Sequence, residues 1–149
     1  MGIAYCHDAR ARLSVSVWDG EVTSDDRVAH ISALASDREW GTGGLLLTDL
    51  RGVSRASLPQ AEQILEAAGA FLQHLAPQVR TAKWAMVAGD TFDQAKRFGA
   101  YIEEEVERLI VFNDLDTACI WLGADKAEVR AIVARLRDGI RSGAVSQLT

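Results

Sequence analysis

The chain alternates short apolar runs with longer segments in which apolar residues recur every three or four positions. The short runs occupy residues 3–7, 12–18, 44–50, 82–88 and 109–112. From residue 19 on, the segment that follows each run has apolar residues at helical spacing. Adjacent strands can form an antiparallel hairpin, whereas helical crossovers make consecutive strands parallel. This order predicts an α/β domain with a mixed sheet of about five strands, in which an N-terminal antiparallel hairpin precedes mostly parallel strands with helices packed on them.

Two of these runs predict different degrees of burial. Residues 12–18 read RLSVSVW, and the alternation of Leu13, Val15 and Val17 with serine is the period of a strand that buries one face. Residues 44–50 are mainly apolar, which is typical of a parallel strand buried on both faces. We therefore expect the second strand to be half-buried and the third to lie centrally in the sheet.

The predicted helices begin at residues that commonly cap helix N-termini. Ser57 is followed three residues later by Gln60, a capping-box arrangement in which each side chain satisfies a backbone N–H of the other residue. The other predicted caps are Thr23, Asp114 and Asp125, and a further helix follows Gly89–Asp90.

Length and composition limit the organisation and the partners. A chain of 149 residues with 48% apolar content suits one domain, here residues 1–123, with an additional C-terminal helix in 124–149 packed on it or at a subunit interface. A net charge of −5 disfavours binding to nucleic acid. Apolar runs of a few residues predict no membrane insertion, and the N-terminus has no secretion signal pattern, so we expect a cytoplasmic protein.

The residue types that carry common chemistries are scattered. His7, His30 and His74 stand apart from one another and from any cysteine pair, so we expect them on the surface or half-buried rather than on a metal. Residues 41–44 read GTGG but precede a strand, which indicates a turn rather than a phosphate-binding loop. We predict no catalytic centre, no metal and no cofactor, and hence no enzyme.

One group of side chains is a candidate ligand site. Asp49, Arg51, Arg55 and Ser57 follow the predicted central strand and approach a helix N-terminus, where ligands of open α/β sheets gather. Two guanidinium groups and backbone N–H groups suit a carboxylate or a phosphate. The alternative is that Asp49 accepts backbone hydrogen bonds, Ser57 only caps the helix, and both arginines are solvated.

Trp40 is a second candidate, because it stands in a glycine-rich connection rather than in a strand or helix. Aromatic side chains are enriched in pockets and at partner surfaces. We expect Trp40 to line a pocket or to contact another protein.

Three pieces of the chain resemble one protein family: RLSVSVWDGEVTSDD, GLLLTDLRGVSRASLPQAE and VFNDLDTACIWLG. They resemble the SpoIIAA-like family, small bacterial proteins related in fold to STAS domains and to the CRAL-TRIO lipid-binding fold. Anti-anti-sigma relatives carry a phosphorylatable serine in an Asp-Ser-Ser-Gly turn, but residues 57–60 here read SLPQ. Phosphate on Ser57 beside Arg51 and Arg55 is electrostatically permissible, yet the resemblance does not imply it.

The resemblance and the scattered chemistry lead to two functional hypotheses. The first is a non-enzymatic binding or regulatory module of the bacterial cytoplasm that acts through contact with a protein partner or with itself as a homodimer. The second is a carrier of a small lipid-like or anionic ligand. An enclosed apolar cavity near the end of the third strand favours the carrier, and a flat exposed surface there favours a protein partner.

Overall fold

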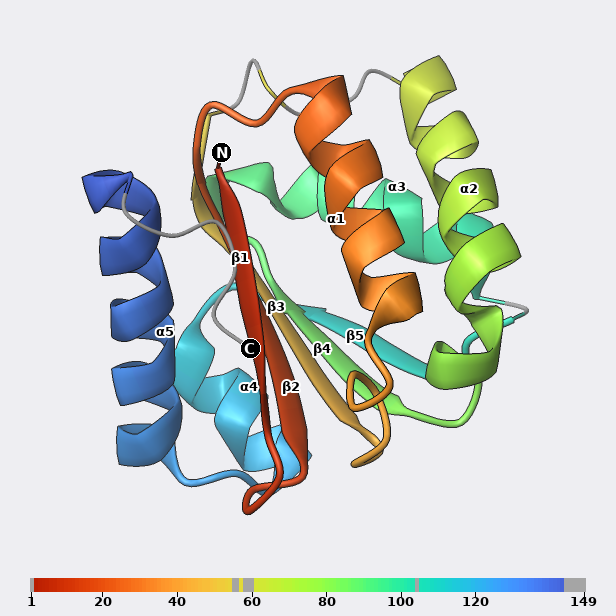
Figure 1. The fold of residues 1–149 in the computed structure, drawn as a ribbon. Coiled ribbons are helices and arrows are strands. Elements are labelled where there is room, and N and C mark those ends of the chain that lie inside the picture. The colour runs from red at the N-terminus through yellow and green to blue at the C-terminus, as the bar shows by residue number, and fades with distance from the viewer. Residues whose placement is uncertain (1, 55–56, 58–60, 104, 144–149) are drawn as a thin grey trace.

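The computed structural model describes residues 2–54, 57, 61–103 and 105–143 (Figure 1). These residues contain one sheet whose strand order follows the chain, β1-β2-β3-β4-β5. β1 pairs antiparallel with β2, and every later pair is parallel. The strands are β1 (Ile3–Asp8), β2 (Leu13–Gly20), β3 (Leu45–Val53), β4 (Lys83–Val87) and β5 (Arg108–Phe112). The predicted α/β fold with a mixed five-stranded sheet is confirmed.

The helices divide between the two faces of the sheet (Figure 1). One face carries α1 (Ser24–Ser36), α2 (Ala61–Val79) and α3 (Phe92–Ile102), the last preceded by the short 3₁₀ helix η2 (Gly89–Thr91). Each of these connections moves one strand further in the same direction, so crossovers of one hand place all three helices on one side. The opposite face carries α4 (Leu115–Leu122) and α5 (Lys126–Ser142).

Each face has its own apolar core, because side chains alternate between the two faces along a strand. Leu46 packs toward α1–α3, whereas Leu47 packs toward α4 and α5. Three of the predicted helix caps are confirmed by hydrogen bonds from first-turn N–H groups to the side chains of Thr23, Asp114 and Asp125.

The prediction of a half-buried β2 is wrong. Ser14 is 1% exposed and Ser16 is 4% exposed, so the serine face is covered as completely as the valine face. β2 lies inside the sheet between β1 and β3, and its serines are on the face of the sheet that α1 covers. Ser14 is satisfied there, because its hydroxyl accepts a hydrogen bond from the Gly41 N–H at 3.0 Å and lies 2.8 Å from His7 Nδ1.

α5 packs on β1 and β2 and is fastened by ion pairs. Arg137 Nε and Arg141 Nε donate to the carboxylate of Asp19, at 3.2 and 2.8 Å, where β2 ends. Gly52 in β3 leaves room for this carboxylate, since a Cβ at that position would lie 1.9 Å from Asp19 Oδ1. Within the residues that the structure describes, no helix combines the length and apolar character needed to cross a bilayer.

Candidate ligand site

Asp49 and Arg51, two members of the predicted site, bind each other. The Asp49 side chain is fully buried, and it accepts hydrogen bonds from the Arg51 backbone N–H (3.0 Å), Arg51 Nε (3.0 Å) and Arg51 Nη2 (2.8 Å). Arg137 Nη2 on α5 adds a fourth at 3.1 Å. Burial raises the pKa of Asp49, but these hydrogen bonds and the two guanidinium charges hold it below its usual value. The Arg51 fork is thus engaged by a carboxylate of the chain itself.

Ser57, the third member, lies against the connection between β2 and α1. Its hydroxyl accepts the Val22 N–H at 3.0 Å, and its carbonyl oxygen accepts Arg27 Nη1 at 3.1 Å. Gln60, the other half of the predicted capping box, and Arg55, the fourth member, lie outside the described residues. The structure therefore joins Asp49 to Arg51 and places Ser57 beside Arg27, which the sequence analysis did not select.

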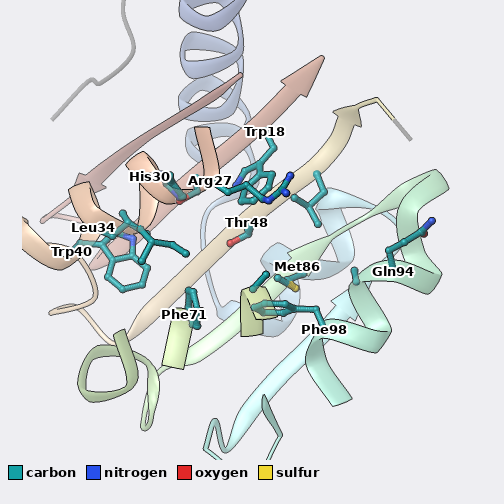
Figure 2. A pocket seen from close by; sticks show the side chains of 15 residues that line it. Trp18, Arg27, His30, Leu34, Trp40, Thr48, Phe71, Met86, Gln94 and Phe98 are labelled. Carbon is teal, nitrogen blue, oxygen red and sulfur yellow. The ribbon is translucent and has the colours of Figure 1, made fainter. Parts of the chain in front are cut away.

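A cavity lies on the other face of the same part of β3. Thr48 and Leu50 point toward α1–α3, whereas Asp49 between them points toward α5. The cavity has a volume of about 120 Å³, lies between the sheet and residues of α1, α2 and α3, and is partly open to solvent (Figure 2). Its floor is one row across the sheet, Ser16, Thr48 and Met86, which are neighbours in strand register.

Two small side chains in this row, Ser16 and Thr48, leave space above the sheet. The preceding row is Ser14, Leu46 and Trp84, and the indole of Trp84 fills the volume above it. Trp84 Nε1 donates to Thr48 Oγ1 at 3.0 Å and so holds the floor residue in place. Ser16 and Thr48 carry short side chains, and both line the cavity.

Aromatic rings form much of the wall, and two of them, Phe71 and Phe98, pack against each other. Phe71 stacks on Trp84 with ring centroids 5.0 Å apart, and it meets Phe98 edge to face at 5.7 Å. In Figure 2 Phe71 and Phe98 border one side of the space, with Trp18 and Trp40 farther apart on the other. Such offset and edge-to-face pairs are the favoured arrangements of aromatic side chains.

Polar atoms in this wall lack partners. Trp40 is 4% exposed, and its Nε1–H finds no acceptor among the described residues. The same holds for Trp18 Nε1, and Gln94 Oε1 finds no donor. A buried polar group without a partner costs about 1–3 kcal/mol, so a ligand that supplies one gains that much. Trp40 therefore lies in the cavity wall rather than on the surface.

His30 also lines the cavity, and it is uncharged. His30 is 6% exposed, and burial lowers the pKa of its imidazole to about 4. It contacts Tyr5 and Trp18 edge to face, at centroid distances of 5.8 and 6.0 Å. The expectation of a surface or half-buried histidine is wrong here, because α1 turns this side chain toward the sheet.

Arg27 is the cation of the cavity wall (Figure 2). Its guanidinium donates to the Ser57 carbonyl at 3.1 Å and to Ser24 Oγ at 3.0 Å, both uncharged acceptors. No carboxylate of the described residues pairs with it. The side chain also lines a surface cleft with Glu21 and Ser57, so it stands where the cavity meets the surface.

Two further kinds of site, metal centres and reactive thiols, have little support in the described residues. The described part of the chain holds no group of histidine, cysteine or acidic side chains arranged to bind a metal ion. Cys6 and Cys119 are buried free thiols. Comparisons of the chain with protein-family models, with curated proteins and with solved structures found no match. Membership of the SpoIIAA-like family therefore stays a prediction.

Proposed function

We propose that the protein is a non-enzymatic binding module that holds a small, mostly apolar ligand in the cavity beneath α1, α2 and α3. The observation that supports this proposal is a partly open cavity lined by aromatic side chains, whose wall contains buried polar atoms without a partner among the described residues. Natural ligand sites combine an apolar lining with a few polar groups that orient the ligand.

The volume sets the size of the ligand. An apolar protein cavity of about 150 Å³ binds benzene, so a cavity of about 120 Å³ accepts a body close to a six-membered ring. Pockets for drug-sized molecules are larger, about 300–1,000 Å³. A two-chain lipid does not fit this volume. Of the lipid-like or anionic ligands in the alternative hypothesis from the sequence, the cavity suits one with a single ring or a short apolar chain.

The lining supports binding rather than catalysis. Among the described residues, the wall contains one cation, Arg27, one neutral histidine, His30, and no carboxylate. Acid–base catalysis uses a positioned group with a pKa near the working pH, and a histidine with a pKa of about 4 is unsuited to that role.

The test is binding of ring-sized compounds to the protein and to a variant with a filled cavity. Ser16→Ile replaces one oxygen by three carbons at the floor, and Ser36→Ile makes the same change at an exposed position on α1 as the control. We expect such compounds to raise the Tm of the wild type and of Ser36→Ile, because binding to the native state stabilises it. Ser16→Ile should show no rise. Equal Tm rises in both variants, or no rise with any ring-sized compound, would overturn the proposal.

The open edge of the sheet favours a second candidate, contact with another copy of the chain. β5 ends the strand order, and Ile110 on it is 40% exposed. The backbone groups of an edge strand can pair with a strand of another molecule. Light scattering over a concentration series tests this: a dimer that Ile110→Lys dissociates supports it, and a monomer at every concentration refutes it.

A further inference from the structure

We propose that the ligand is an organic carboxylate, with its carboxylate bound by Arg27 and its ring or short apolar chain in the cavity. This inference rests on the proposed function and specifies the chemical class of the ligand. It starts from the position of Arg27, the one described residue that lines both the cavity and the cleft next to it.

The guanidinium has donors to spare. An arginine carries five N–H donors, and the hydrogen bonds that Arg27 makes to described residues are two, to the neutral oxygens of Ser57 and Ser24. Arg51 and Arg137 differ, because both are paired with the buried Asp49. Glu21 shares the cleft with Arg27 but does not form an ion pair with it. Arg27 is therefore ready to bind an external carboxylate through two parallel hydrogen bonds.

The boundary position also lowers the cost of binding an anion. A charge moved wholly into an apolar interior loses its hydration at a large energetic cost. At Arg27 the carboxylate stays beside a cleft lined by polar residues, among them Thr23 and Ser54, while the apolar body enters the cavity. A cavity of about 120 Å³ and one cation at its edge suit a molecule with one ring and one acidic group.

The unpartnered atoms have the matching polarity. Within the described part of the chain, two buried indole N–H groups, those of Trp18 and Trp40, lack an acceptor, and one buried acceptor, Gln94 Oε1, lacks a donor. Together with Arg27 the wall offers mainly donors, and donors select ligands with oxygen acceptors. A cationic amine would meet Arg27 with the wrong sign and is excluded.

The experiment compares three probes of one shape: benzoate, its neutral analogue benzamide, and benzylamine. Affinities are measured by calorimetry, with the Tm rise as a second readout. We expect benzoate to bind at least tenfold more tightly than benzamide, and benzylamine not to bind. Arg27→Gln should reduce this preference for benzoate to less than threefold, and Arg27→Lys should retain part of it because the charge remains.

The outcomes separate this inference from the proposed function. If benzoate and benzamide bind equally, or if Arg27→Gln leaves the benzoate preference intact, the carboxylate assignment is wrong while the cavity remains a ligand site. If no probe binds and Ser16→Ile changes nothing, both proposals fail. Unfolding of the Arg27 variants in urea checks that they fold, and a benzoate preference that persists in a folded Arg27→Gln protein is sufficient to refute the inference.

Discussion

Replacing Gly52 by alanine should break the attachment of α5 to the sheet. The new Cβ would lie 1.9 Å from Asp19 Oδ1 and 3.0 Å from its Cγ, much closer than non-bonded atoms approach. The carboxylate must therefore move away from Arg137 Nε, which it now meets at 3.2 Å. The strand backbone itself tolerates alanine, because Gly52 does not have a positive φ.

The magnitude follows from the burial of the pair. Deleting one partner of a buried ion pair costs about 3–5 kcal/mol. The Asp19 and Arg137 side chains are 7% and 18% exposed, and Arg137 keeps its contact with Asp49, so we expect a loss near the low end, about 3 kcal/mol. The pair with Arg141, whose side chain is 63% exposed, is screened by water and adds little. For a chain of this length the loss lowers Tm by roughly 6–12 °C.

A double-mutant cycle in urea tests the mechanism. Gly52→Ala should cost about 3 kcal/mol in the wild type but less than about 1 kcal/mol in an Asp19→Ala background, where the clashing atoms are gone. Gly69→Ala is the control, since nothing lies within 4 Å of a Cβ at this exposed helical position, and it should stabilise the protein slightly. An equal cost of Gly52→Ala in both backgrounds would refute the reasoning.

Two further predictions concern buried titratable groups. Because burial lowers the pKa of His30 to about 4, the unfolded chain binds more protons between pH 6.5 and 4, and stability should fall by about 3 kcal/mol across that interval. His30→Leu should remove this slope in urea titrations, whereas His74→Leu at an exposed position should leave it, and an unchanged slope in His30→Leu would contradict the assignment. The lowered pKa of Asp49 means that its contribution is present above about pH 4 and lost as pH falls further, so Asp49→Asn should destabilise the protein by about 2–4 kcal/mol at pH 7 and flatten the loss below pH 4. A cost below about 1 kcal/mol at pH 7 would show that the Asp49 charge matters little.

The fold was predictable because its signals are local. The alternation of strands with helices sets the strand order, and caps such as Thr23 act within a few residues. Periodicity in β2 identifies which residues share a face, but it does not tell which faces are covered. Ser16 was therefore expected at the surface, although α1 and the neighbouring strands bury it.

The site was less predictable because its contacts are distant in sequence. Arg27 reaches Ser57, 30 residues away, and Arg137 reaches Asp49, 88 residues away. Asp49 and Arg51 were selected because they lie close together along the strand. The sequence did not indicate that Arg137 on α5 also binds Asp49, which makes this group an internal ion-pair cluster. The sequence signal for a cavity was the pair of small side chains Ser16 and Thr48, which are neighbours across β2 and β3. Small side chains leave a cavity when that face of the sheet is covered, and the sequence did not show that the serine face of β2 is covered.

The closure of the second face by α5 has a consequence for synthesis of the chain. Asp19 and Arg141 are 122 positions apart, and a ribosome adding about 5–20 residues per second needs roughly 6–24 s to make the intervening segment. During that time Leu13, Val15 and Val17, all fully buried in the finished protein, have no helix to cover them. The apolar face that β1 and β2 present to α5 is therefore uncovered until α5 has been made, and we expect chaperones to bind the nascent chain most during this interval.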